Sequence, residues 1–147
     1  MPTSTQVSHP LTLVMNIKST EDYQELVTLL GDPKIKETIN EALTKVGTVH
    51  FARFVFLSEK QLLVATSYDG DFDTYIKAFT VYLGDIFDAL LSHMDDAPPL
   101  PVSENLPQFL EYIKCNDRSR IDGVLQSLYS AYPTLTVQDI LGLAGGG

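Results

Sequence analysis

His50 and Asp69 are the residues of this 147-residue chain whose types and positions best suit acid–base chemistry. Each lies near the end of a short segment rich in β-branched and aromatic residues. If the two segments pair as a hairpin that turns at residues 59–60, His50 faces Asp69 and Arg53 faces Thr66. A carboxylate beside an imidazole fixes its tautomer and raises its basicity, as a general base requires. We therefore take His50 and Asp69 as candidate catalytic residues; the alternative is a histidine that only completes a hydrogen bond at a strand end.

Arg53 is a cation on an otherwise apolar face of the first segment. A guanidinium that leaves water needs an anionic or multiply hydrogen-bonding partner. One interpretation is that Arg53 anchors the carboxylate of a small ligand in a cavity of the sheet. The other is a structural ion pair with a partner chain or with Asp69, Asp71 or Glu111. The predicted ligand-binding residues are Arg53, Tyr68, His50, Phe51 and Thr66.

Two further groups of reactive side chains carry weaker signals. His93 precedes Asp95 and Asp96, but the histidines of the chain form no i, i+4 pair and have no Cys-x-x-Cys partner, so we predict no metal site. Cys115 follows Lys114, which favours a thiolate, but no base accompanies it in the sequence and we expect it to be inert. The sequence has no glycine-rich phosphate loop and no Gly-x-Ser-x-Gly elbow.

The elements that must position these residues are marked by apolar periodicity and by capping residues. Ser19, Asp32 and Asp71 each precede a stretch with apolar residues at helical spacing, and Pro33 suits a first helical position. The expected elements are a strand over 11–17, helices after Ser19 and Asp32, a hairpin over 48–57 and 62–69, and a long helix from 72 to 91.

The last third of the chain is less regular. Three prolines mark residues 95–105 as a loop, and a short helix follows over 106–114. Residues 124–132 fit either a helix by their spacing or a fourth strand, and we take 128–132 as the strand. A last helix is predicted over 137–143, which begins at a capping box of Thr136 and Asp139. The domain prediction is a flexible N-terminus (1–9), one α+β domain (10–144) and a flexible tail (145–147).

The order β, α, β, β, α, β predicts a ferredoxin-like α+β fold, an antiparallel sheet with helices on one face and extra C-terminal helices. Both faces of the strand over 48–57 are largely apolar. Helices cover only one face, so a second copy of the sheet is the expected cover for the other. We therefore predict a homodimer, arranged as a dimeric α+β barrel.

The composition limits the classes of partner. The formal net charge of -9 repels phosphate backbones and anionic lipid headgroups, so we expect neither nucleic acid nor a membrane as partner. No stretch approaches the roughly 20 apolar residues that span a bilayer. With a single cysteine and no secretory signal pattern, the expected location is cytoplasmic.

Several segments resemble small proteins of the dimeric α+β barrel superfamily. The segments that carry the resemblance are Val49-His50-Phe51-Ala52-Arg53-Phe54, Leu62-Leu63, residues 68–75, Ala131-Tyr132-Pro133 and Thr136-Val137. The superfamily includes dye-decolourising peroxidases, whose Gly-x-x-Asp-Gly motif is matched here at Asp69 and Gly70, whereas Thr66 replaces the first glycine. The resemblance therefore implies fold and assembly more strongly than haem chemistry.

The leading expectation is a homodimer that binds a small apolar or aromatic anionic ligand in a cavity of the sheet. One alternative is a haem-dependent or cofactor-free oxygenase or peroxidase-like enzyme that uses His50 and Asp69. Another is a non-catalytic interaction scaffold whose acidic surface meets a basic partner. The sequence leaves these three open, and with them the cofactor, for which haem is one possibility.

Overall fold

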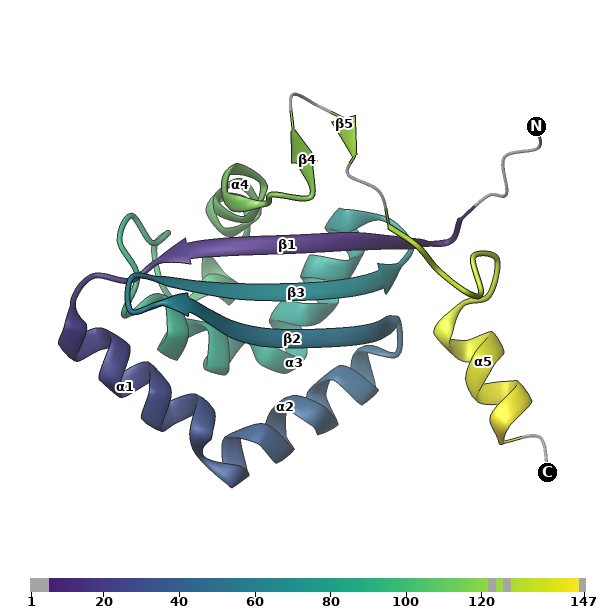
Figure 1. Ribbon diagram of the computed structural model, residues 1–147, viewed down its shortest axis with the longest axis horizontal. Coiled ribbons are helices and arrows are strands. Elements are labelled where there is room, and N and C mark those ends of the chain that lie inside the picture. Colours follow the sequence, from purple (N-terminus) through teal and green to yellow (C-terminus); the bar gives the residue numbers. More distant parts are fainter. Residues whose placement is uncertain (1–5, 122–123, 126–127, 146–147) are drawn as a thin grey trace.

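A computed structural model describes residues 6–121, 124–125 and 128–145 of the chain. It has an α+β fold whose main sheet is three-stranded and antiparallel, in the order β1-β3-β2 (Figure 1). The strands are β1 (Ser8–Asn16), β2 (Val49–Ser58) and β3 (Gln61–Asp69). The helices are α1 (Thr20–Gly31), α2 (Pro33–Val46), α3 (Phe72–Leu91), α4 (Leu106–Asn116) and α5 (Val137–Ala144), with a 3-10 turn, η1, at Val102–Glu104. No helix in the described ranges is long and apolar enough to cross a membrane.

The predicted capping residues begin the helices. The side chains of Ser19, Asp32 and Asp71 accept hydrogen bonds from backbone N–H groups in the first turns of α1, α2 and α3. Each of these bonds satisfies a donor that a helix start otherwise leaves unpaired. The capping box of Thr136 and Asp139 forms at the start of α5, so the predicted start of that helix is confirmed as well.

The core lies between one face of the sheet and the long helix α3. In β1 and β3, fully buried residues alternate with partly exposed ones, as expected when only one sheet face is covered. In Figure 1, α3 lies behind the sheet, and no helix lies in front of its central part. Ten residues of α3 are buried, and they include Tyr75, Phe79, Leu83 and Phe87. The other face of the sheet is therefore the open one.

The predicted register of the hairpin is wrong by one residue over most of its length. Ser58 pairs with Gln61 as predicted, but the pairing shifts between Phe56 and Ser58, so that Arg53 lies opposite Ala65 and not Thr66. The cause is a β-bulge, which adds one residue to β2. From Phe56 back to Phe51, each residue therefore lies opposite a β3 residue one position earlier than predicted. A second shift lies between Val49 and Phe51.

The fourth strand of the main sheet is not found where it was predicted. Residues 128–132 have no regular structure, and β4 (Arg120–Ile121) and β5 (Val124–Leu125) pair only with each other among the described residues. The free edge of β1 is partly occupied instead by the turn after α4, because Asp117 bridges Leu13 and Arg118 N donates to Thr12 O at 2.7 Å. This contact leaves that edge unavailable to a full fourth strand.

Candidate functional site

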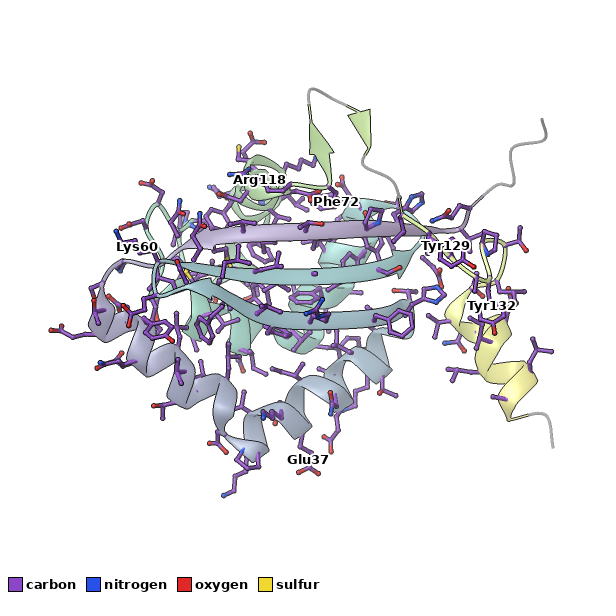
Figure 2. The ribbon with its side chains drawn as sticks, in the orientation of Figure 1. Glu37, Lys60, Phe72, Arg118, Tyr129 and Tyr132 are labelled. Carbon is purple, nitrogen blue, oxygen red and sulfur yellow. The ribbon has the colours of Figure 1, made fainter. Side chains whose placement is uncertain are left out.

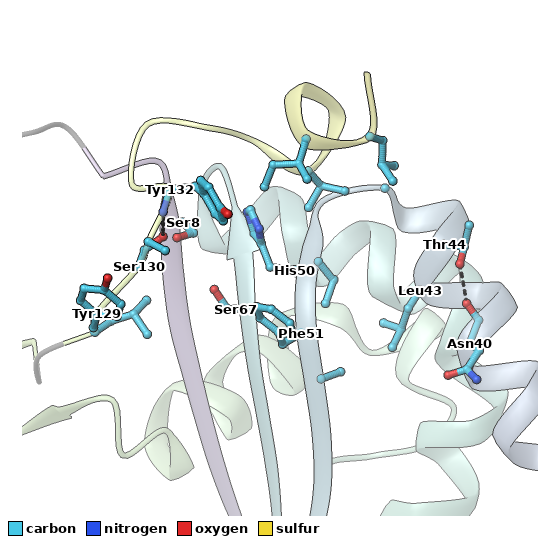
Figure 3. A pocket seen from close by; sticks show the side chains of 18 residues that line it. Ser8, Asn40, Leu43, Thr44, His50, Phe51, Ser67, Tyr129, Ser130 and Tyr132 are labelled. Carbon is cyan, nitrogen blue, oxygen red and sulfur yellow. Dashed lines mark hydrogen bonds between the residues drawn. The ribbon is translucent and has the colours of Figure 1, made fainter. Parts of the chain in front are cut away.

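A cavity of about 800 Å³ lies at one end of the sheet. The start of β2, the C-terminal half of α2 and residues between 128 and 141 supply most of its lining, and Ser8 of β1 and Ser67 of β3 complete it. Figure 3 shows His50, Phe51, Ser67 and Tyr132 around this space. Apart from His50 and two tyrosines, no titratable side chain lines it within the part of the chain that is described.

The C-terminal wall of the cavity is held by hydrogen bonds to residues just before β1 and β2. Gln138 Nε2 donates to Gly47 O at 2.9 Å, and Val7 N donates to Pro133 O at 2.8 Å. Gly47 ends α2 with φ of 77°, a left-handed conformation that favours glycine, and a Cβ there would lie only 3.2 Å from the Gln138 amide. Gly47 therefore serves both the turn and the close approach of α5.

His50 and Asp69 meet at the edge of the cavity. His50 Nε2 lies 2.7 Å from Asp69 Oδ1, and the two side chains are only 12% and 8% exposed. The predicted contact is thus present, although the register around it differs from the predicted one. A partly buried carboxylate in this position orients the imidazole and limits its rotation.

Asp69 also anchors α5. Its second oxygen, Oδ2, accepts a hydrogen bond from Val137 N at 2.7 Å, and Val137 is the first residue of that helix. A carboxylate at a helix N-terminus is favoured by the unpaired N–H groups and by the helix dipole. One side chain therefore holds both the imidazole and the first turn of α5 in place, whereas the sequence predicted only the first of these contacts.

The other ring nitrogen of His50, Nδ1, is accessible. Nδ1 has no protein hydrogen-bond partner in the described part of the chain. Every buried side-chain nitrogen or oxygen described there has a partner, so an unpartnered Nδ1 must be accessible. Because His50 lines the cavity, Nδ1 is the polar atom with which it can meet a ligand.

The predicted ligand-binding residues do not gather in one place. His50 and Phe51 line the cavity, whereas Arg53, Thr66 and Tyr68 are not among its described lining residues. Thr66 and Tyr68 face the core, where Tyr75 donates a hydrogen bond to Thr66 and stacks on Tyr68 with ring centroids 4.2 Å apart. Arg53 is exposed on the open face. It has no ion pair or hydrogen bond within the described ranges, so the predicted structural pair with an acid is not seen there.

Sequence reasoning missed the wall supplied by the C-terminal segment. Tyr129, Ser130 and Tyr132 line the cavity, and Val137 and Ile140 of α5 complete it. Tyr129 and Tyr132 lie beside the end of the sheet where α5 is attached (Figure 2). The available signal was a pair of tyrosines ahead of a capping box, but the predicted strand over 128–132 placed them in the sheet.

His93 is paired with acids other than those predicted from its sequence neighbours. Its Nδ1 lies 2.8 Å from Asp22 Oδ1 and 3.4 Å from Glu25 Oε2 of α1, and these three ligand atoms lie within 4.8 Å of one another. Hydrogen bonding from Ser19 and from His93 lowers the pKa of the Asp22 carboxyl. The contacts of His93 with the two carboxylates by themselves account for this cluster.

Cys115 lacks the surroundings of a nucleophile. It is exposed, and its thiol donates to Glu111 at 3.5 Å. That hydrogen bond raises the pKa of Cys115, which disfavours the reactive thiolate. Of the reactive groups considered from the sequence, only His50 thus combines an orienting carboxylate with access to a cavity.

Comparisons of the chain with protein-family models, curated proteins and solved structures found no match. The functional argument therefore depends on the geometry of the site. That geometry combines a largely apolar cavity, a histidine oriented by a carboxylate, and a wall attached by a few hydrogen bonds. Such a site suits the capture of a small molecule better than contact with a large charged surface.

Proposed function

We propose that the protein binds a small, mainly apolar or aromatic molecule in the cavity between β2, α2 and residues 128–141. The observation that carries this proposal is the cavity itself, since about 800 Å³ is within the range of small-molecule sites. Its side chains are mostly aliphatic or aromatic, with a few polar groups that can fix the orientation of a ligand.

The charge of the lining favours an uncharged ligand over the anionic one expected from the sequence. Arg53, the anchor expected for a carboxylate, is on the open face of the sheet and not in the cavity wall. A carboxylate in a largely apolar site without a cation would lose its hydration with little compensation. We therefore propose a neutral aromatic molecule as the ligand.

A matched pair of threonines on α2 allows a direct test. Thr44 and Thr38 are both exposed, and each hydroxyl donates to the carbonyl four residues earlier, but only Thr44 lines the cavity. Isothermal titration with 2-naphthol as the probe should show binding to the wild type and to Thr38→Trp. Thr44→Trp should weaken binding at least about tenfold, because the indole occupies the cavity. If no neutral aromatic probe binds the wild type, the proposal is wrong.

We further propose that the protein forms a homodimer through the open face of the sheet, in the ferredoxin-like, dimeric α+β barrel manner. The supporting observation is an apolar surface that none of the described helices covers: Phe51 is 76% and Leu57 is 52% exposed, and Val55 and Leu63 are partly exposed. Arg53 is the only Lys, Arg, Asp or Glu with an exposed side chain on this face among the described strand residues. In a chain of net charge -9, two copies meet here without repulsion between acidic residues.

The oligomeric state tests this assembly. Sedimentation equilibrium at micromolar concentration should give twice the mass of the chain for the wild type. Val55→Glu should give monomers, because it puts a carboxylate in the middle of the open face. Val81→Glu is the matched control, since Val81 is 76% exposed on α3. A monomeric wild type would contradict the dimer and leave the cavity proposal standing.

A further inference from the structure

A neighbouring carboxylate sets the hydrogen-bonding role of the ring of His50, a residue that lines the cavity. We infer that His50 Nδ1 acts only as an acceptor, so that the cavity selects phenols over aromatic molecules of similar shape that lack a hydrogen-bond donor. This inference rests on the proposed binding function and names the chemical class of its ligand.

The first step is the tautomer of His50. An ionised carboxylate only accepts hydrogen bonds, and Asp69 Oδ1 lies 2.7 Å from His50 Nε2. Asp69 Oδ2 is already bound by Val137 N–H at 2.7 Å, so the carboxylate is fixed by donors on both oxygens. The ring proton of a neutral imidazole must therefore be on Nε2, which leaves Nδ1 with a lone pair.

The second step is that Nδ1 has no hydrogen-bond partner among the residues that the structure describes. It is accessible in the described structure and belongs to a side chain that is only 12% exposed, at the edge of a largely apolar cavity. A ligand that enters displaces water from this atom. A phenol replaces the lost hydrogen bond, whereas an ether or a fluoroarene leaves the lone pair unpaired, and sites of this kind reject analogues without the donor.

The third step is that other polar groups of the cavity do not impose this preference. The hydroxyls of Ser8, Ser67 and Tyr132 can each donate or accept by rotation about one bond. Figure 3 places these hydroxyl-bearing side chains around the same end of the cavity as His50. They can satisfy either kind of ligand. The Thr44 hydroxyl also lines the cavity and donates to Asn40 O, but it belongs to an exposed residue and can keep water as its partner, so the discrimination between donors and acceptors depends on the less exposed His50.

Three probes of similar shape test the inference by isothermal titration at pH 8: 2-naphthol, 2-fluoronaphthalene and 2-methoxynaphthalene. The wild type should bind 2-naphthol about tenfold or more tightly than either analogue. His50→Phe keeps an aromatic ring but removes the acceptor, so the three probes should bind within about threefold of one another. Equal binding of all three by the wild type would overturn the inference and leave the proposed function intact. Failure of all three to bind would contradict the proposed function itself.

The Asp69→Asn variant tests the assigned cause. Its amide can donate to Nε2 and still accept from Val137 N–H, which moves the ring proton to Nδ1. The preference for 2-naphthol over 2-methoxynaphthalene should then fall to about threefold or less. Nitrogen-15 NMR of the imidazole should show Nε2–H in the wild type and Nδ1–H in the variant. A wild-type imidazolium, with protons on both nitrogens at pH 8, would contradict the inference.

Discussion

Helices α3 and α5 both begin at side-chain caps, but they are held to the sheet in different ways. Asp71 caps α3 through the N–H and hydroxyl of Thr74, and Thr136 with Asp139 caps α5. Ten of the 20 residues of α3 are buried, whereas no residue of α5 is. Packing therefore places α3, and a small number of hydrogen bonds places α5. The cavity lies beside α5, where hydrogen bonds and not buried side chains hold the helix. A ligand there would contact apolar side chains that the helix leaves unburied.

A ladder of aromatic rings shows how closely α3 is packed. Tyr68, Tyr75, Phe79, Phe87 and Phe109 form successive ring contacts with centroids 4.2 to 6.0 Å apart. Offset and edge-to-face contacts of this kind add to the free energy of simple burial. Next to α5 the polar contacts of Asp69 and Gln138 take the place of such a ladder. Mutations of the aromatic residues packed on α3 should therefore lower the free energy of unfolding more than mutations of the residues that attach α5.

The largest effect is expected in the ladder. Phe87→Ala should lower the free energy of unfolding by about 3–5 kcal/mol, because it removes a ring that is 1% exposed and leaves a cavity between α3 and α4. Urea denaturation monitored by circular dichroism measures this loss. Val81→Ala, on the exposed side of α3, should change the free energy by no more than about 0.5 kcal/mol. Equal effects of the two variants would contradict the packing difference.

Asp69→Ala comes next and tests the attachment of α5. His50 Nε2 and Val137 N–H both lose their acceptor, so the free energy of unfolding should fall by about 1–3 kcal/mol. Hydrogen exchange should show faster exchange of the Val137 amide than in the wild type. Asp85→Ala, an exposed residue of α3, is the control and should leave that amide unchanged. Unaltered protection of Val137 in Asp69→Ala would show that other contacts hold α5.

The elements around α3 could be predicted from the sequence because each one has a local signal. Apolar spacing and the caps at Asp32 and Asp71 marked α2 and α3, and a polar turn between two apolar segments marked the β2–β3 hairpin. An antiparallel sheet that contains these three strands followed from the same pattern, although the predicted sheet had a fourth strand. Local signals also brought His50 and Asp69 together, since both lie at the same end of one hairpin.

The cavity could not be predicted because it depends on long-range contacts and on an irregular register. Nothing in the apolar spacing shows the bulge between Phe56 and Ser58, and that bulge puts Arg53 opposite Ala65 instead of Thr66. Residues 128–132 have the composition of a strand, but the free edge of β1 is bridged by Asp117. The hydrogen bond from Val137 N to Asp69 Oδ2 joins residues 68 positions apart, and no local sequence pattern predicts it.

Thr136→Ala should have a smaller and more local effect. It removes the side-chain acceptor of Asp139 N, which is one half of the capping box, and costs α5 about 1 kcal/mol. Because no residue of α5 is buried, this loss should appear as faster hydrogen exchange over residues 137–144, with the urea midpoint unchanged. Thr28→Ala, whose hydroxyl bonds a carbonyl within α1, should leave exchange in α5 as it is. A shifted midpoint for Thr136→Ala would mean that α5 unfolds with the core.

The smallest effect concerns the cap of the packed helix and depends on pH. Hydrogen bonds from the backbone N–H and the hydroxyl of Thr74 lower the pKa of Asp71 below its ordinary value of 3.8. A carboxylate whose pKa is lower in the folded state stabilises the fold above the unfolded-state pKa, and this contribution is lost as the pH falls through the folded-state pKa. Wild type should thus be more stable than Asp71→Asn at pH 7, and the difference should shrink below pH 3.8.

Urea midpoints between pH 2.5 and pH 7 measure this difference, with Asp85→Asn on the exposed side of α3 as the control. Because α3 carries much of the core, its cap should influence unfolding of the whole domain, unlike the cap of α5. The Asp71→Asn effect should therefore appear in the urea midpoint, whereas the Thr136→Ala effect should appear only in local exchange. A pH-independent gap between wild type and Asp71→Asn would show that the charge of Asp71 does not contribute to the cap, and that Thr74 is satisfied equally well by a neutral amide.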